Sequence, residues 1–203
     1  MTDWIGMIEA NEEVFRPAPE PAGGAAVLIP LLRGGDGETR ILFEQRALDL
    51  DVQPAEICFP GGGIEPGETP AETVCREAEE ELLISRGQIR ILGETEGVVT
   101  NGGLYRIRAF VGELSGYEGT FFPGEVDHVF TVPLEWFRAH EPEQYMTTQT
   151  TVPDEDFPFE LIPGGRNYPW RSGRTPVWFY RHPEGVIWGL TARILVTFLR
   201  KLG

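Results

Sequence analysis

Residues 59–84 read FPGGGIEPGETPAETVCREAEEELLI, a glycine-rich loop that leads into a charged segment with helical periodicity. Thr69 is a good N-cap, Pro70 suits the first helical position, and Glu72 stands where it completes a capping box. These signals predict a helix that begins at Pro70, directly after the loop. We expect the rest of the chain to be organised around this loop and helix.

The predicted helix has one apolar face and one acidic face. Three carboxylates at positions i, i+3 and i+4 share the acidic face and repel one another. Nothing basic in the helix can neutralise all three, whereas a bound divalent cation can, and hard oxygen ligands suit Mg²⁺ or Mn²⁺. The apolar face comprises Ala71, Val74, Cys75, Ala78 and Leu82, and the acidic face comprises Glu77, Glu80 and Glu81.

The alternative is a solvated acidic helix, which is what most runs of charge form. That alternative accounts for Glu72 and Glu79, which are expected to point away from the cluster. It does not account for the glycine loop that leads into the helix, or for Glu68 at the end of that loop. The loop and helix together therefore favour a metal site.

The spacing of these residues resembles the Nudix box of the Nudix hydrolase superfamily. Leu83 stands where the box has its closing glycine, so we expect the exit from the helix to be lengthened or redirected there. The resemblance implies a mixed sheet between helices and metal-dependent hydrolysis of a nucleoside diphosphate linked to another group. The matching pattern is Gly62-x5-Glu68-x7-Arg76-Glu77-Ala78-x-Glu80-Glu81-x-Leu83-Ile84.

A second pattern, upstream of the box, resembles the motif L-L-T-x-R-[S/A]-x3-R-x3-G-x3-F-P-G-G of coenzyme A pyrophosphatases. Arg46, Ala47 and the Phe-Pro-Gly-Gly run fall in register with it, but Asp51 replaces the second arginine and Ala55 the glycine. The resemblance implies cleavage of coenzyme A into 3′,5′-ADP and 4′-phosphopantetheine. An ion pair of Arg46 with Asp49 or Asp51 is the alternative to a phosphate contact. If coenzyme A is the substrate, Arg106 and Arg108 are available to replace the missing arginine.

The resemblance assigns roles to individual residues. Glu80 and Glu81 are expected as metal ligands, Glu77 as ligand or base, and the carbonyl of Gly62 as a further ligand. Arg76 is expected to orient the carboxylates through Glu77 or Glu68, and Glu68 to be structural. The expected site residues are therefore Glu77, Glu80, Glu81 and Arg76 for catalysis, Glu77, Glu80, Glu81 and Gly62 for metal, and Arg46, Gly61 and Gly62 for substrate.

Two other functions stay open beside the coenzyme A reaction. The first is hydrolysis of another nucleotide, such as ADP-ribose or a dinucleoside polyphosphate, which Asp51 favours. The second is a domain that senses a nucleotide without turnover, which the complete set of carboxylates disfavours. Glu125 is a candidate for a catalytic base outside the helix.

Composition limits the class of protein. The 203 residues carry a net charge of −15 and are 41% hydrophobic, which indicates a globular domain and disfavours nucleic-acid or anionic-membrane partners. We expect a small-molecule nucleotide as the partner, leave a homodimer open, and interpret Cys58 and Cys75 as small core residues rather than a disulfide. The N-terminal residues resemble no signal peptide, and no apolar run is long enough to span a membrane, so a cytoplasmic location is expected.

The remaining pattern predicts one α/β (α+β) domain, a mixed sheet between helices, over residues 1–203. Within it, 1–24 form an N-terminal extension with a proline-rich linker at 16–24, and 25–203 form the Nudix fold. A turn at residues 34–37 and another at 101–103 are expected to join pairs of strands. Short helices are expected near Trp4, at 134–139 and at 190–202, and strands at 25–32, 39–46, 56–59, 89–99, 105–114, 129–132, 146–152, 159–162 and 177–181.

Overall fold

A computed structural model describes residues 2–11, 24–35, 37–100 and 105–203. Within these residues the body of the protein is a seven-stranded mixed sheet in the order β3-β2-β1-β6-β5, with β4 paired to β1 and β7 paired to β2. The β1–β6 pair is parallel and the other pairs are antiparallel. The strands are β1 (Ala25–Arg33), β2 (Thr39–Arg46), β3 (Ile57–Cys58), β4 (Gly61–Gly63), β5 (Ile89–Thr100), β6 (Tyr105–Leu114) and β7 (Val126–Pro133).

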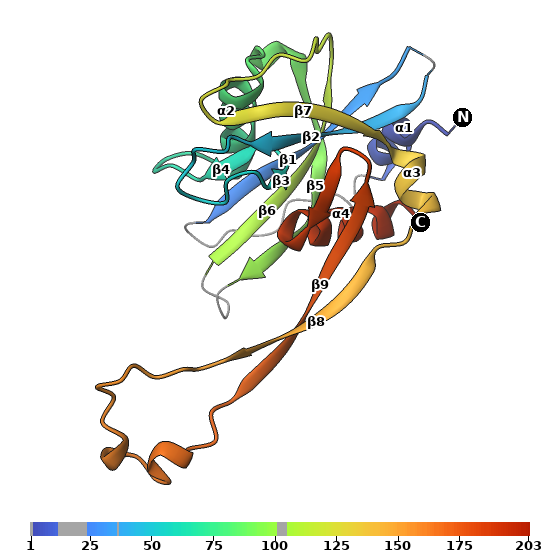
Figure 1. The fold of residues 1–203 in the computed structure, drawn as a ribbon. Coiled ribbons are helices and arrows are strands. Elements are labelled where there is room, and N and C mark those ends of the chain that lie inside the picture. The colour runs from blue at the N-terminus through green and yellow to red at the C-terminus, as the bar shows by residue number, and fades with distance from the viewer. Residues whose placement is uncertain (1, 12–23, 36, 101–104) are drawn as a thin grey trace.

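Helices cover both faces of this sheet, and each face has its own apolar core (Figure 1). Side chains alternate across the strands, so that Leu28 and Leu42 pack beneath α2 while their neighbours Ile29 and Phe43 pack on the opposite face. The expected mixed sheet between helices is confirmed. The helices are α1 (Trp4–Ala10), α2 (Pro70–Leu82), α3 (Leu134–Ala139) and α4 (Gly189–Leu202), with a 3-10 turn at Arg86–Gln88.

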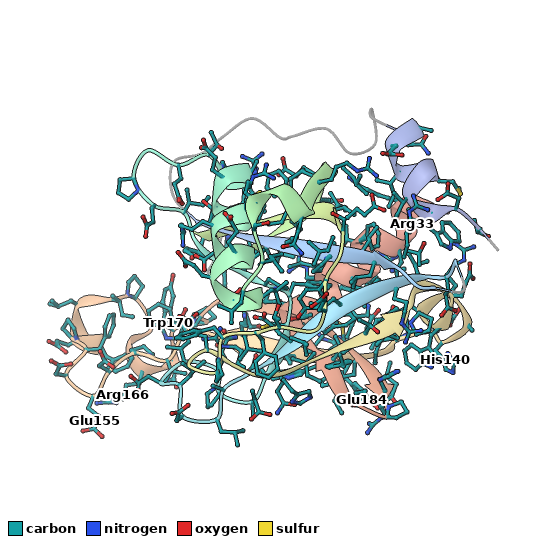
Figure 2. All side chains as sticks on the ribbon, turned by 90° about the horizontal axis from the view of Figure 1, so that it is seen from above. Arg33, His140, Glu155, Arg166, Trp170 and Glu184 are labelled. Atoms are coloured by element: carbon teal, nitrogen blue, oxygen red, sulfur yellow. The ribbon has the colours of Figure 1, made fainter. Side chains whose placement is uncertain are left out.

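A second sheet, β10-β9-β8, continues into a long two-stranded extension that projects from the body (Figure 1). Its strands are β8 (Glu143–Thr150), β9 (Ser172–His182) and β10 (Gly185–Trp188). The side chains of β8 are exposed beyond its first residue. Figure 2 shows Glu155 and Arg166 at the far end of this extension, away from the body.

The sequence predicted the body better than the extension. The helix at 134–139 and the first hairpin are confirmed, and β10 was not expected. The strand expected at 159–162 is wrong, because Phe159–Leu161 forms a 3-10 turn in which the Leu161 amide bonds the Pro158 carbonyl at 3.0 Å. Linker residues 16–23, Asp36 and the turn at 101–103 lie outside the described residues. No helix in the described part of the chain combines the length and apolarity needed to cross a bilayer.

Candidate active site

Helix α2 begins as its sequence predicts. The amide of Glu72 donates to Thr69 Oγ1 at 3.3 Å, and the amide of Thr69 donates to Glu72 Oε2 at 2.8 Å, which forms the capping box with Pro70 at the first helical position. Val74, Ala78 and the rest of the apolar face are packed beneath the helix against the sheet. The N-terminus of α2 is therefore determined locally.

The end of α2 corrects the expectation for Leu83. The helix ends at Leu82, and Leu83 adopts the left-handed conformation, with φ 52° and ψ 45°. This is the conformation that a glycine supplies at a helix C-terminus, so the exit is neither lengthened nor redirected. The leucine keeps the turn at a steric cost that a glycine would avoid.

A later loop closes the same helix end. The amide of Phe122 donates to the Glu81 carbonyl at 2.8 Å, and Thr120 Oγ1 donates to the Leu82 carbonyl at 2.6 Å. These two bonds satisfy carbonyls that lack partners inside the helix. They also fix the segment that carries Glu125, whose carbonyl accepts from the Ala47 amide at 2.9 Å. Glu125 thereby comes close enough for its charge to act on the carboxylates of α2.

Arg76 links the loop and the acidic face of α2. Its Nε donates to Glu68 Oε1 and its Nη1 to Glu77 Oε1, both at 2.8 Å, and Nη1 also reaches Glu80 Oε2 at 3.3 Å. The expected contacts of Arg76 with Glu68 and Glu77 are present. Hydrogen bonding to Arg76 lowers the pKa of Glu68 to about 2, so this carboxyl is ionised at neutral pH. Glu80, whose side chain is 58% exposed, lies on the outer side of the cluster.

Glu81 is on the inner side of the cluster and is buried. Its Oε2 accepts a hydrogen bond from the Gly61 amide at 2.9 Å. Burial first, and then the nearby charge of Glu44, raise the pKa of Glu81 to about 9. Burial likewise raises the pKa of Glu77, against the opposing effect of Arg76.

Close approach to the neighbouring strand requires a glycine at position 61, while the space at position 62 is filled by the Glu77 carboxylate. Gly61 has φ 155°, and a Cβ there would lie 2.3 Å from the Ala26 carbonyl oxygen on the neighbouring strand. A Cβ on Gly62 would lie 2.2 Å from Glu77 Oε1. The two glycines therefore allow the loop backbone to lie against the carboxylates of Glu77 and Glu81.

Glu44 is a member of this cluster that the sequence analysis did not single out. It lies on β2 and is 1% exposed, and its Oε1 accepts from Cys58 Sγ at 3.3 Å. Its Oε2 is buried without a hydrogen-bond partner. Burial raises the pKa of Glu44 to about 7. The available signal was a carboxylate in the apolar run ILFEQ, on the strand face that Leu42 shares with α2.

The chemistry of these side chains fits a divalent cation, although their present contacts do not form a ready metal site. Within the described residues, no three His, Cys, Asp or Glu side chains are arranged to hold a metal ion. Arg76 engages Glu77 and Glu80, and the Gly61 amide engages Glu81. Yet hard oxygen donors gather here with raised pKa values, and one of them, Glu44 Oε2, has no partner. A cation would relieve this repulsion if the present hydrogen bonds were exchanged.

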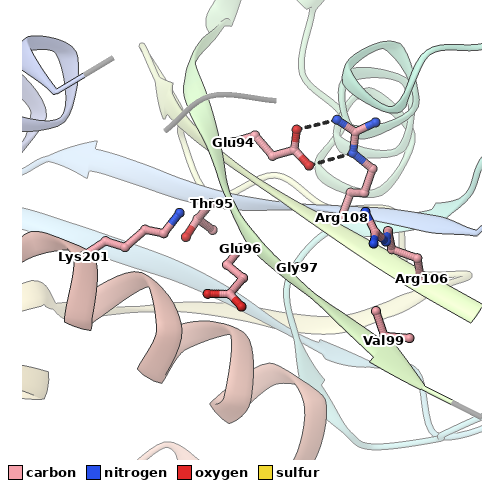
Figure 3. A pocket seen from close by; sticks show the side chains of 8 residues that line it. All are labelled: Glu94, Thr95, Glu96, Gly97, Val99, Arg106, Arg108 and Lys201. Atoms are coloured by element: carbon pink, nitrogen blue, oxygen red, sulfur yellow. Dashed lines mark hydrogen bonds and ion pairs between the residues drawn. The ribbon is translucent and has the colours of Figure 1, made fainter. Parts of the chain in front are cut away.

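Of the basic residues expected to contact substrate, Arg46 lies near the carboxylate cluster, whereas Arg106 and Arg108 line another cavity. Arg46, at the end of β2, donates from Nε to the Val52 carbonyl at 3.3 Å, and its charge acts on Glu44. Arg108 is buried and paired with Glu94 through two hydrogen bonds (Figure 3). This pairing disfavours the expectation that Arg108 contacts a substrate phosphate in place of the missing arginine. Arg106 lines a cavity of ≈ 420 Å³ beside β5, together with Lys201 of α4 (Figure 3).

Comparisons with known proteins show which family this chain resembles. The NUDIX domain family matches residues 23–156. Nudix hydrolase 3 of Caenorhabditis elegans is 33% identical over 114 residues, which are 54% of this chain and 47% of that protein. The chloroplastic Nudix hydrolase 22 of Arabidopsis thaliana is 29% identical over 201 residues, 95% of this chain and 58% of that protein.

The name of a third relative includes a substrate. The peroxisomal coenzyme A diphosphatase NUDT7 of Mus musculus is 33% identical over 134 residues, 65% of this chain and 55% of that protein. The chain thus spans about half the length of these curated relatives. The family match covers the sheet, the glycine loop and α2 with its carboxylates. This chain belongs to the Nudix domain family.

Proposed function

We propose that the protein is a metal-dependent Nudix pyrophosphohydrolase that cleaves the diphosphate of coenzyme A or its derivatives into 3′,5′-ADP and 4′-phosphopantetheine. The observation that carries the proposal is the cluster of carboxylates where α2 meets the glycine loop, in which Glu44 and Glu81 are buried. Glu81 and Glu77 come from the helix, and the charges of Glu44 and Glu125 act on Glu81 from two other segments. Such a concentration of negative charge suits a site whose working form contains a cation.

The position of each residue in the cluster determines its proposed role. Glu77 and Glu81 would hold Mg²⁺ or Mn²⁺ from the inner side, with Glu80 on the outer side and the Gly62 carbonyl from the loop. A bound divalent cation supplies Lewis-acid stabilisation of the charge that develops on the diphosphate oxygens. Arg76 and the Gly61 amide hold Glu77 and Glu81 in place through the hydrogen bonds described above.

Proton transfer requires a carboxylate beside the attacking water. Glu125 suits this role because its loop is fixed against the end of α2 by Phe122 and Thr120, while its own backbone is fixed to Ala47. Glu77 is the alternative base on the helix itself. A base within hydrogen-bond reach of the water would accept the proton that the water loses when its oxygen attacks phosphorus.

Two observations favour coenzyme A as the substrate. Arg46 occupies the first arginine of the coenzyme A motif, and its charge acts on Glu44 inside the carboxylate cluster. In the described part of the chain it forms no ion pair with Asp49 or Asp51, so its guanidinium can contact a phosphate. One relative, described above, is named a coenzyme A diphosphatase.

A second substrate class is supported by Asp51. This carboxylate is exposed and stands where the coenzyme A motif has an arginine, so it would repel the phosphate that the arginine would attract. Hydrolysis of ADP-ribose or a dinucleoside polyphosphate is therefore the alternative, and nucleotide sensing without turnover is a third. The homodimer and the cytoplasmic location stay predictions.

A substrate panel tests the proposal. Coenzyme A, dephospho-coenzyme A, ADP-ribose and diadenosine polyphosphates would be compared at one Mg²⁺ concentration, with products resolved by mass spectrometry and Glu81→Gln as the low-activity control. We expect the highest kcat/KM for coenzyme A and no turnover in excess EDTA. A higher kcat/KM for another compound would refute the coenzyme A assignment, and turnover in EDTA would refute the metal mechanism.

A further inference from the structure

Glu44 has an unusual environment for a carboxylate in a strand. It points from β2 to the face that Leu42 shares with α2, where the surrounding core is apolar. It is 1% exposed, and only one of its two oxygens has a hydrogen-bond partner, the thiol of Cys58. Leaving a buried carboxylate oxygen without a partner is costly, so the position calls for a ligand.

The neighbouring charges indicate which kind of ligand suits this carboxylate. The carboxylates of Glu77 and Glu125 act on Glu44, and among nearby charges Glu44 has the largest effect on Glu81. Arg46, two residues along the same strand, directs its Nε to the Val52 carbonyl. The unpaired oxygen of Glu44 thus lies among other carboxylates and accepts no hydrogen bond from the Arg46 guanidinium.

A purely structural role explains this arrangement poorly. A threonine occupies this place in the coenzyme A motif quoted above, and a neutral side chain could accept from Cys58 without adding charge to the cluster. A structural carboxylate would also be expected to have both oxygens paired, as the buried Glu94 does with Arg108. An additional carboxylate oxygen in this cluster is stabilised only if it interacts with a positively charged group.

We propose that Glu44 is a further oxygen ligand for the divalent cation of this site, contributed by β2 to the carboxylates of α2. This inference rests on the proposed function, which assigns the cation to Glu77, Glu80 and Glu81. It adds a ligand from outside the Nudix box. The sheet, and not the helix alone, would then determine how tightly this chain holds its metal.

Metal affinity tests the proposal directly. Metal-free wild-type protein and the variants Glu44→Gln and Glu44→Thr would be titrated with Mn²⁺, and the free ion measured by electron paramagnetic resonance. Glu79→Gln is the matched control, because it removes one carboxylate from the same helix while Glu79 lies outside the cluster. We expect the Kd for Mn²⁺ to rise at least tenfold in both Glu44 variants and to stay within twofold in Glu79→Gln.

Thermal unfolding separates ligation from a structural role. Without metal, Glu44→Gln should melt at the same temperature as the wild type or higher, because a buried unpaired carboxylate is removed. The rise in melting temperature that Mn²⁺ produces should be smaller than in the wild type. A lower metal-free melting temperature with an unchanged Kd would show a structural role and overturn the proposal.

The same titration distinguishes this inference from the proposed function. If Glu81→Gln loses Mn²⁺ binding while both Glu44 variants bind as tightly as the wild type, the metal site stands and the role of Glu44 is refuted. If the wild type itself does not bind Mn²⁺, both proposals are refuted together.

Discussion

Replacing Leu83 by glycine should stabilise the protein, although it removes a large side chain. Leu83 has φ 52° and ψ 45°, a conformation that costs an L-residue about 1–2 kcal/mol relative to the right-handed one. Glycine avoids that cost but loses about 0.5–1 kcal/mol through its greater freedom in the unfolded chain. The leucine side chain is 54% exposed, so its removal sacrifices little burial. We expect Leu83→Gly to raise the free energy of unfolding by about 0.5–1 kcal/mol.

Chemical denaturation of Leu83→Gly and Leu83→Ala measures the free-energy cost of the left-handed backbone at this position. Alanine removes the same contacts but keeps the Cβ, so the difference between the two variants isolates the backbone conformation. Glycine should be more stable than alanine by about 1 kcal/mol, which for a chain of this length is about 2–4 °C in melting temperature. If Leu83→Gly is no more stable than Leu83→Ala, the left-handed turn does not carry the cost that we assign to it.

Three further predictions concern the carboxylate cluster. Glu81 has a pKa raised from 4.5 to about 9, so between these two pH values the folded state binds more protons than the unfolded state. Without metal, the free energy of unfolding should therefore fall between pH 5 and 9, by up to about 1.4 kcal/mol per pH unit for each proton, and Glu81→Gln should flatten this slope in denaturation curves. Steady-state kinetics should show that Glu81→Gln lowers kcat on the order of 100-fold. Glu80→Gln should have a smaller effect, because Glu80 is half-exposed on the outer side of the cluster. Equal losses of kcat would contradict the inner position of Glu81 and the outer position of Glu80. Gly62→Ala should displace the Glu77 carboxylate, because its Cβ would meet Oε1 at 2.2 Å, and a variant with wild-type kcat would refute this close packing.

Local sequence was enough to determine α2 and its immediate surroundings. The capping box at Thr69 and Pro70 acts within one turn of helix, and the contacts of Arg76 with Glu68 and Glu77 join residues that a single loop and helix bring together. Strands of the sheet could be recognised because apolar residues recur along them with a regular period. The prediction at Leu83 was wrong because it was based on residue type alone. The leucine was expected to change the end of the helix, but its backbone adopts the left-handed conformation that a glycine would adopt there.

Only the tertiary structure decided which distant groups complete the cluster. Glu44 comes from β2 and Glu125 from the loop that caps α2, and only the packing of these segments brings their charges close enough to act on Glu81. Arg108 looked available in the sequence, but pairing of β5 with β6 places it against Glu94 in the interior. Local signals in the chain determine where elements begin and end, whereas the pairing and packing of those elements determine the charge and burial that each side chain meets.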